Sequence, residues 1–342
     1  MSKISVIIPA YNAAETITDC LISVSRQQDV DLELIVIDDG STDDTVVKIT
    51  SFSASAPFQV KLQSISNSGP AGARNAGLAL AEGEYICFID ADDTMEPEML
   101  KIMLQDAEYT GADMVIADFN LIAGKENRRQ NAFMGNKDIL CKADELPSVI
   151  ADYLDTPRGA SFFTNIWGKL YKNSIIRSKN IRFDISLQTW EDTVFNCRYV
   201  SEISSIKYIR KHLYNYYVNP GQNSTGGKLF VQPFGHRKVI DELKRALEKY
   251  HWESGKINAL IQRAETYFTV KNLLVAAALV RDKKNSAAEL TELIDSYIGD
   301  SRTVKLLSGY RWRKGESLLI PLLFRLKLKK MLFSVCMRKV CK

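Results

Sequence analysis

The stretch "YICFIDADD", residues 85–93, joins an apolar run to three aspartates, Asp90, Asp92 and Asp93. The apolar part predicts a buried β-strand. Clustered carboxylates at a strand end repel one another and lose solvation. A divalent cation that bridges them to phosphate groups makes such a cluster favourable, because Mg²⁺ and Mn²⁺ prefer oxygen ligands. A helix capped by Thr94 is the structural alternative, although a cap explains only one of the three acids.

The residues before this stretch alternate between strand and helix signals. Apolar runs rich in β-branched residues predict strands at 4–10, 32–38, 58–65 and 85–90, and helical patterns lie between them at 14–28, 41–49 and 69–83. Nearly continuous apolar strands that alternate with helices indicate an α/β fold, with a mostly parallel sheet flanked by helices. Ligands of such sheets bind beyond the carboxyl ends of the strands. The polar residues that follow each strand are therefore expected at one rim.

The remainder of the chain is less regular up to about residue 220. Residues 112–120 have a strand pattern, and residues 165–176 indicate an irregular stretch that passes into a helix. Residues 232–300 are rich in Ala, Leu, Lys and Glu and have helical periodicity. The pattern predicts a sheet domain followed by a helical domain.

The charge of the chain is divided unevenly. Residues 302–342 contain 12 Lys or Arg and one acid, so this tail carries +11, while the remaining 33 basic and 40 acidic residues give −7 for residues 1–301. The tail mixes basic with apolar residues, a pattern that favours an anionic membrane surface as partner. A helix packed on the rest of the protein with a solvated basic face is the alternative. Because the body is acidic and has no nucleic-acid-binding motif, we expect no nucleic-acid partner.

Cysteine usage and hydropathy predict the compartment. Six cysteines occur without a CxxC or any regular spacing, which indicates a reducing compartment and neither a disulfide framework nor a zinc site. The first residues, "MSKISVIIPAYN", do not form a signal peptide. The longest apolar run elsewhere, residues 317–324, is far below the roughly 20 residues that cross a bilayer. We therefore expect a cytoplasmic protein, peripheral on the inner face of the cell membrane.

Five motifs resemble glycosyltransferase family 2. They are "ISVIIPAYNAAETITDCLISVSRQ" (4–27), "LELIVIDDGSTDDT" (32–45), "GPAGARNAGLALAEGEYICFIDADD" (69–93), "WGKLYK" (167–172) and "WEDTVFN" (190–196). The resemblance covers residues 3–225 and implies the GT-A nucleotide-sugar-binding fold, a Rossmann-like sheet with a C-terminal helical region. It divides the chain into a catalytic domain (1–228), a helical region (229–301) and the basic tail (302–342). The implied function is inverting, metal-dependent transfer of a hexosyl or N-acetylhexosaminyl group from a UDP-sugar to a glycan or lipid-linked acceptor, in bacterial surface polysaccharide synthesis.

The resemblance also implies a role for individual residues in binding the donor. The residues that line the base and ribose pocket are Pro9, Tyr11, Asp39 and Asn67, with Asp39 accepting from the uracil N3–H. Arg74 lies near the pyrophosphate, Asp90 holds the ribose, and Asp93 faces the donor sugar or the acceptor. Asp92 coordinates the Mn²⁺ or Mg²⁺ ion. His212 is a further candidate ligand, although a lone histidine is more often structural.

The motif "TWEDTVFN" supplies the remaining chemistry. An inverting transfer needs a base for the proton of the acceptor hydroxyl, and the resemblance assigns this role to Asp192, with Glu191 binding the acceptor or orienting the site. Both acids also suit the first turn of a helix. The implied acceptor residues are Trp167, Lys169 and Trp190, and Trp167 equally suits core packing. Residues 213–227 correspond to a segment that often closes over the diphosphate, but Val218 stands where many relatives have arginine.

Two other functions fit parts of this pattern. A nucleotidyltransferase can use a related fold and a metal, but it has no need of the Glu191–Asp192 pair, and no glycine-rich nucleotide loop occurs near the start of the chain. A catalytically inactive nucleotide-sugar-binding module is the other possibility. The presence of all the implied acids argues against it.

Overall fold

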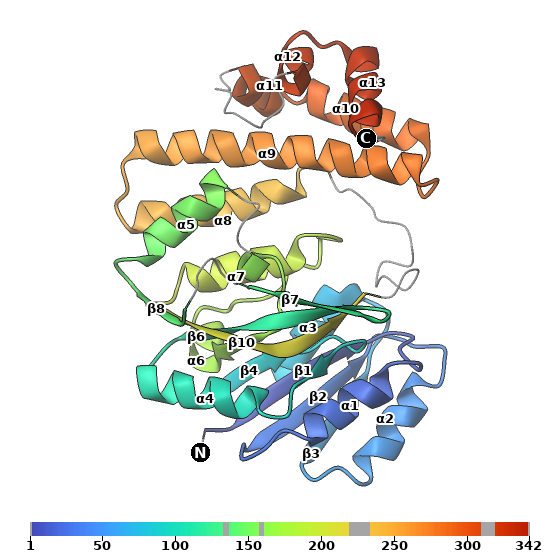
Figure 1. The fold of residues 1–342 in the computed structure, drawn as a ribbon, viewed down its shortest axis with the longest axis vertical. Coiled ribbons are helices and arrows are strands. Elements are labelled where there is room, and N and C mark those ends of the chain that lie inside the picture. Colours follow the sequence, from blue (N-terminus) through green and yellow to red (C-terminus); the bar gives the residue numbers. More distant parts are fainter. Residues whose placement is uncertain (1, 133–136, 157–160, 219–232, 309–318, 341–342) are drawn as a thin grey trace. The chain divides into compact units, whose positions relative to one another are not determined.

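The computed structural model describes residues 2–132, 137–156, 161–218, 233–308 and 319–340 (Figure 1). The chain forms two compact units. The first contains residues 1–147 and 159–219, and the second contains residues 148–158 and 220–342. The predicted boundary at residue 228 lies outside the described residues. The second unit takes in residues 148–158, which the prediction assigned to the catalytic domain, and it joins the tail to the helices before it.

The first half of the sheet agrees with the prediction. Strands β1 (Ile4–Ala10), β2 (Leu32–Asp38), β3 (Gln59–Ser64) and β4 (Tyr85–Phe88) are parallel neighbours in the order β3-β2-β1-β4. The helices between them are α1 (Ile17–Ser25), α2 (Thr45–Ser53) and α3 (Gly69–Leu80).

Both faces of β1 are covered, so its buried residues run almost without interruption. Ile4, Val6 and Ile8 share a core cluster with residues of α1. Ile7 points to the other face, where a Cβ atom on Gly77 of α3 would lie 2.4 Å from its Cγ2 atom. The glycine therefore allows α3 to approach the sheet closely. This two-sided burial is the physical reason why the strand sequence shows no alternation.

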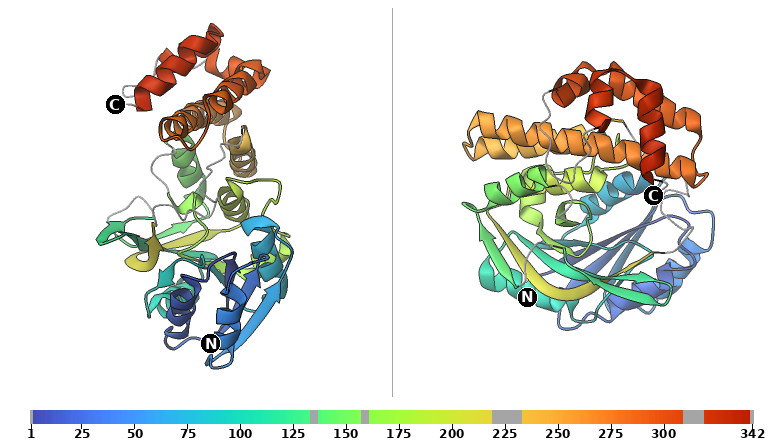
Figure 2. Two further views of the ribbon diagram at one scale, coloured as in Figure 1. Left: turned by 90° about the vertical axis from the view of Figure 1, so that its right-hand side faces the viewer. Right: turned by 45° about the horizontal axis from the view of Figure 1, so that its top comes forward.

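The second half of the sheet is mixed (Figure 2). From β4 the order continues β9-β6-β10-β5, where β6 and β10 are parallel and the other three pairings are antiparallel. The strands are β5 (Thr94–Met95), β6 (Met114–Ala123), β9 (Lys169–Lys172) and β10 (Ser205–Tyr217). Two outer strands, β7 (Glu126–Gln130) and β8 (Ile139–Lys142), pair with β6 and β10 respectively.

One local prediction was wrong in this half, and one alternative is excluded. Residues 169–172 form strand β9, where the sequence indicated an irregular stretch, and the expected helix follows as α6 (Asn173–Ser178). Thr94 lies in β5 and does not cap a helix, because α4 (Met99–Thr110) begins five residues later. Two further elements of this unit are η1 (Ser161–Phe163) and α7 (Glu191–Val200).

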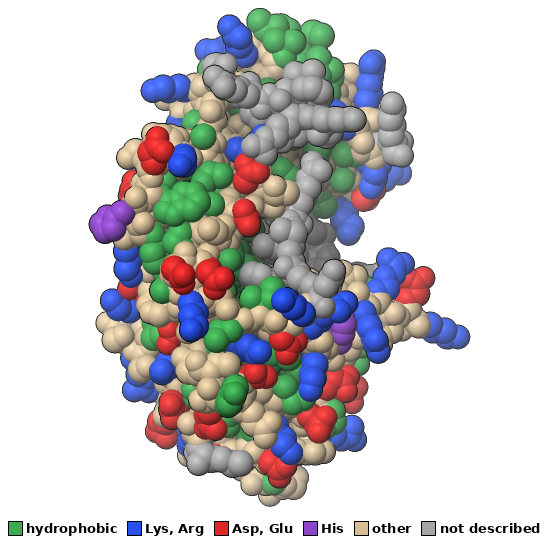
Figure 3. All heavy atoms as spheres, turned by 60° about the vertical axis from the view of Figure 1, so that its left-hand side comes forward, with side chains coloured by type: hydrophobic (Ala, Val, Ile, Leu, Met, Phe, Trp, Pro, Cys, Tyr) green, Lys and Arg blue, Asp and Glu red, His purple; other side chains and the backbone are tan. Residues whose placement is uncertain are grey.

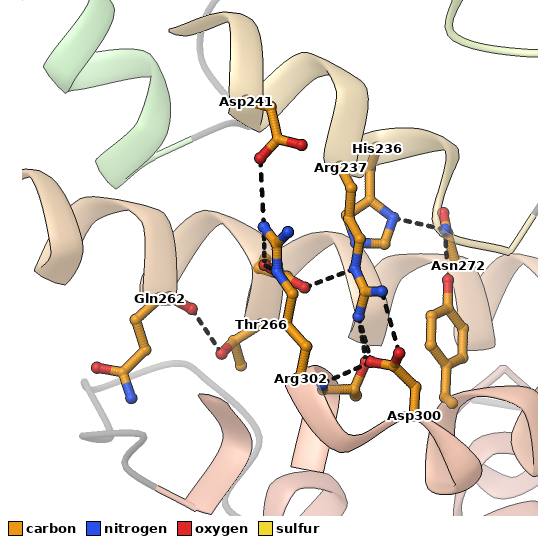
Figure 4. Close-up of polar contacts among 11 residues, drawn as sticks. His236, Arg237, Asp241, Gln262, Thr266, Asn272, Asp300 and Arg302 are labelled. Atoms are coloured by element: carbon orange, nitrogen blue, oxygen red, sulfur yellow. Dashed lines mark hydrogen bonds and ion pairs between the residues drawn. The ribbon is translucent and has the colours of Figure 1, made fainter. Parts of the chain in front are cut away.

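The second unit is helical, as predicted. Its helices are α8 (Gly235–Lys249), α9 (Ser254–Arg281), α10 (Ala287–Gly299) and α11 (Ser301–Ser308), with most of α5 (Leu146–Asp155). An ion-pair network around the buried Glu265 joins α8, α9, α10 and α11 (Figure 4). Glu265 of α9 is 1% exposed and lies 2.8 Å from Arg237 of α8 and 2.9 Å from Arg302 of α11. Arg237 also binds Asp300, which ends α10. Because the charges are paired, their burial is tolerated.

The tail continues this unit with two more helices, α12 (Leu319–Arg325) and α13 (Lys329–Val340). Ile320, Phe324, Leu332 and Cys336 are fully buried and share a core cluster with residues of α9 and α10. The packed-helix interpretation of the tail is therefore confirmed for one face of these helices.

Candidate active site

The three aspartates after β4 lie together, as their spacing predicts. One carboxylate oxygen from each of Asp90, Asp92 and Asp93 lies within 4.8 Å of the others. The turn is closed by the Asp93 N–H, which donates to the Asp90 carbonyl at 3.1 Å. Burial, and secondly the charge of Asp90, raises the pKa of Asp92 to about 6. The cluster therefore resists full ionisation, and a divalent cation would remove that repulsion.

Asp93 occupies a different environment from the one predicted. Its side chain is fully buried, and both carboxylate oxygens are bound by β10. The Tyr214 hydroxyl donates to Oδ2 at 2.7 Å, and the Tyr217 N–H donates to Oδ1 at 2.8 Å. Burial, with the charges of Asp90 and Asp92, raises the pKa of Asp93. Asp93 thus ties β10 to the turn, and these two contacts do not favour the predicted role of facing the donor sugar or the acceptor.

The predicted base and ribose residues lie at the carboxyl ends of neighbouring parallel strands. Tyr11 directly follows β1 and is 52% exposed, and Asn67 is exposed beyond β3. Pro9 lies within β1 and is half-buried. Asp39 follows β2 and is buried, and its Oδ1 atom accepts from the N–H and the hydroxyl of Ser68, at 2.7 and 3.1 Å. The Asp39 carboxylate is thereby fixed at the start of α3.

Arg74 of α3 joins three motifs that lie far apart in the sequence. Its side chain is 5% exposed. Nη2 lies 2.8 Å from Asp90, and Nη1 lies 2.9 Å from Asp192 and 4.0 Å from Glu191. Burial opposes the charged form of Arg74, but the acids, chiefly Asp192, raise its pKa above the ordinary value. A permanently charged, forked side chain therefore holds the "DADD" turn next to the "WEDTVFN" helix.

Glu191 and Asp192 form the first turn of α7, which confirms the helix-terminus interpretation and is compatible with a role in the site. Burial raises the pKa of Asp192 and Asp90 adds to the shift, whereas Arg74 and Lys169 oppose it. Burial and Asp192 likewise raise the pKa of Glu191. The helix is preceded by Trp190, a half-buried residue with a left-handed φ of 78°. A bulky residue in this region is strained, and such strain concentrates at functional sites.

The motif "WGKLYK" contributes to the core rather than to an open acceptor surface. Trp167 is 8% exposed and stacks on Tyr214, with ring centroids 4.5 Å apart, and on Tyr216 at 5.2 Å. Lys169 is 1% exposed, and its ammonium donates to the Asn165 carbonyl and side chain and to the Trp167 carbonyl. Burial lowers the pKa of Lys169 to about 7, against the charge of Asp192. Direct contact of Trp167 or Lys169 with an acceptor does not fit this burial.

His212 lies on β10, and the aspartate cluster does not include it. It pairs in register with Asp118 of β6. Burial lowers the pKa of His212, the Asp118 carboxylate opposes this shift, and the charges of Arg129 and Arg210 add to it. A metal-ligand role for His212 is not supported by these neighbours. The segment predicted to close over the diphosphate lies, from residue 219 onward, outside the described residues.

Ser68 and Tyr214 are site residues that the sequence did not indicate. Ser68 holds Asp39, and Tyr214 holds Asp93. Their partners lie 29 and 121 residues away along the chain. The local signals for Tyr214 were its place in the segment 213–227, predicted to close over the diphosphate, and the aromatic alternation "YNYY" at 214–217, which places Tyr214 and Tyr216 on one face of a strand.

Comparisons with known proteins agree with this geometry. The model of glycosyl transferase family 2 matches residues 5–179, just over half of the chain. The chain belongs to glycosyltransferase family 2. The five family motifs named above lie in the first unit, and this unit has the architecture that the resemblance predicted.

Relatives and solved structures add detail. The uncharacterised glycosyltransferase EpsJ of Bacillus subtilis is 28% identical over 217 residues, which are 64% of this chain and 61% of EpsJ. The cholesterol galactosyltransferase of Borreliella burgdorferi is 28% identical over 225 residues, 65% of this chain and 62% of that protein. The chain therefore spans less than two thirds of the length of either relative. The crystal structure of Staphylococcus aureus TarS 1–349 in complex with UDP-GlcNAc matches with a TM-score of 0.67 and 20% identity, over 97% of this chain and 90% of that one. The GT-A fold is thus confirmed.

Proposed function

We propose that this family 2 protein is an inverting, metal-dependent glycosyltransferase that uses a UDP-sugar donor. The observation that carries the proposal is the pair of contacts made by Arg74, which holds Asp192 and Asp90 at 2.9 and 2.8 Å. A candidate base is thereby placed next to the turn that carries the donor-binding acids. The likeness to TarS, which was solved with UDP-GlcNAc, supports a UDP-sugar with a hexosyl or N-acetylhexosaminyl group as donor.

In the proposed reaction, the acceptor hydroxyl attacks the anomeric carbon on the side opposite the diphosphate. Asp192 takes the hydroxyl proton as the new C–O bond forms, and the bond to the UDP oxygen breaks. Arg74 and Lys169 both oppose the raised pKa of Asp192, so their charges favour the ionised form that a base requires. Glu191, which lies 4.0 Å from Arg74, is proposed to orient the acceptor.

The aspartate cluster fits a Mn²⁺ or Mg²⁺ ion, because its oxygens lie within 4.8 Å of one another and the pKa of Asp92 is raised to about 6 by burial and Asp90. Asp92 would hold the ion, which would neutralise the departing diphosphate. Asp90 remains the proposed ribose contact, and Arg74 fixes its Oδ1 atom. Asp39, Tyr11, Pro9 and Asn67 are proposed to line the base and ribose pocket at the adjoining strand ends.

We further propose that the acceptor is a glycan or lipid-linked oligosaccharide of a cell-surface polysaccharide. The B. burgdorferi relative is named for transfer to cholesterol, a membrane lipid, so its name supports an acceptor held in a membrane and not specifically a glycan. None of the helices in the described part of the chain has both the length and the apolar character that crossing a bilayer requires. The basic tail, residues 302–342, carries +11, and we propose that it attaches the protein to the inner face of the membrane.

Asp192→Asn tests the proposed base. We expect UDP affinity, measured by calorimetry, to stay nearly unchanged, because the amide of the substituted side chain would keep an oxygen for Arg74. Sugar transfer should fall by about 10² or more, the scale for losing a general base. Donor hydrolysis over a panel of UDP-sugars with Mn²⁺ identifies the donor for this assay.

Asp106→Asn is the matched control, since the Asp106 side chain is 26% exposed and paired with Lys207, much as the Asp192 side chain is 20% exposed and paired with Arg74. A parallel loss of UDP affinity and rate in Asp192→Asn would make Asp192 a binding residue. UDP-sugar binding by the unaltered protein without any turnover would instead favour the inactive binding module.

A further inference from the structure

The corner between α12 and α13 exposes a concentration of apolar side chains. Nine large hydrophobic residues are exposed in the described part of the chain, and five of them fall within residues 319–331. They are Leu319 (45%), Leu322 (49%), Leu326 (55%), Leu328 (39%) and Met331 (53%). Exposed apolar residues are common singly, but a contiguous group marks an interaction surface. We call these five residues and the basic residues among them the corner surface.

The basic residues of the corner surface alternate with the apolar ones. Residues 325–331, "RLKLKKM", are all exposed and contain four basic residues and no acid. Lys329 lies 2.6 Å from Asp295 of α10. Arg325, Lys327 and Lys330 form no ion pair with any residue that the structure describes. Hydrophobic side chains with Lys and Arg beside them are visible at the top of Figure 3. Positive charge here is therefore largely uncompensated.

The same segment also supplies core residues from its other face. Ile320, Leu323 and Phe324 of α12 are buried, whereas Leu319 and Leu322 of the same helix are exposed. The buried set belongs to the core cluster with α9 and α10. The exposed leucines, Leu319 and Leu322, are not part of that cluster. The segment thus has one face packed in the core and one exposed face that carries apolar and basic residues.

We propose that the corner surface docks on a bilayer that contains anionic lipid. Its leucines and Met331 enter the boundary between head groups and acyl chains, while Arg325, Lys327 and Lys330 bind the lipid phosphates. A bilayer interface accepts this alternation because it places negative phosphates directly above an apolar layer. A second copy of the same surface would bring like charges together. This proposal names the residues that make the membrane attachment proposed above. It does not depend on the transfer reaction.

The test is sedimentation of the full-length protein with phosphatidylcholine vesicles, with and without phosphatidylglycerol. We expect the unaltered protein to pellet with the anionic vesicles only, and less as salt rises. The double variants Leu322→Gln/Leu326→Gln and Lys327→Gln/Lys330→Gln should each bind about tenfold more weakly or worse, since each nearby charge contributes on the order of 1 kcal/mol, with a comparable loss from each leucine.

Two matched variants serve as controls. Val47→Gln/Tyr109→Gln alters two exposed apolar side chains outside the corner surface, 62% and 91% exposed, and Lys249→Gln/Lys256→Gln removes two exposed lysines of the second unit. Both should pellet like the unaltered protein. The free energy of unfolding in urea should be the same in all variants. If the leucine variant is less stable, the vesicle binding of the lysine variant alone tests the proposal.

Three results would overturn the proposal. In the first, the unaltered protein does not pellet with anionic vesicles. In the second, the corner variants pellet as much as their controls. In the third, the leucine variant has a lower oligomeric mass than the unaltered protein without vesicles, which would make the corner surface an interface between copies. Donor hydrolysis measured without vesicles separates this proposal from the proposed function. A protein that binds vesicles but hydrolyses no UDP-sugar would leave the docking surface standing and reject the transferase.

Discussion

Arg74→Lys is the substitution that most directly examines the proposed site. The guanidinium of Arg74 contacts two carboxylates through two different nitrogens, at 2.9 Å to Asp192 and 2.8 Å to Asp90. Lysine keeps the charge but offers one compact ammonium, which cannot reproduce both contacts with the same geometry. One charge-assisted hydrogen bond is therefore lost in a place where the arginine side chain is only 5% exposed. Bonds to charged groups contribute about 1.5–3 kcal/mol, so the free energy of unfolding should fall by about that amount.

The same substitution should change the pH dependence of turnover. Burial raises the pKa of Asp192, and Arg74 is the first of two charges that oppose the shift. When the direct contact with Arg74 weakens, the pKa of Asp192 rises further, and less of the base is ionised near neutral pH. We expect the acid limb of kcat/KM for UDP-sugar transfer to move to higher pH, with partial recovery of rate in alkaline buffer.

Arg128→Lys is the control for this experiment. Arg128 also pairs with a carboxylate, that of Glu126, but the two side chains are 67% and 63% exposed. Exposed pairs contribute about 0–1 kcal/mol, and lysine can replace arginine there at little cost. If Arg74→Lys changes neither urea unfolding nor the pH profile more than Arg128→Lys does, the buried contacts of Arg74 do not organise the site.

Asp92→Asn should abolish the stimulation of donor hydrolysis by Mn²⁺, because an amide cannot neutralise the cation, and an unaltered Mn²⁺ titration would exclude Asp92 as a ligand. Tyr214→Phe removes the 2.7 Å bond to the buried carboxylate of Asp93 and should lower the free energy of unfolding by about 1–3 kcal/mol, whereas Tyr216→Phe, which keeps that bond, should cost less. In chelated buffer, the contribution of Asp92 to stability should be present below its ordinary pKa of 3.8 and be lost as pH rises through about 6, because the folded state holds its proton more tightly. Thermal unfolding measured between pH 4 and 7 gives the change of stability with pH, and Asp92→Asn should make this change smaller. An identical slope in the variant would assign the effect to other groups.

Local patterns in the sequence determined the first half of the fold. Strands buried on both faces need uninterrupted apolar residues, so β1, β2 and β4 were visible as such runs, and the polar residues that follow them were correctly expected at one rim. The strand β9 was missed because its four residues, "KLYK", are too few to show a period and include a buried lysine. The motif order was sufficient to indicate the family, which the family match confirmed.

Tertiary structure alone decided which residues meet and which are enclosed. Arg74 and Asp192 lie 118 residues apart in the sequence, and neither motif predicts the hydrogen bond between their side chains. The burial of Asp93 by β10, the enclosure of Lys169, and the division of the tail into a packed and an exposed face likewise depend on neighbours from distant segments. The periodicity of apolar residues in the sequence indicates on which side of its own helix or strand a residue lies. What covers that side, and therefore whether a charge there meets substrate, a buried partner or solvent, is set by contacts that form only when the chain has folded.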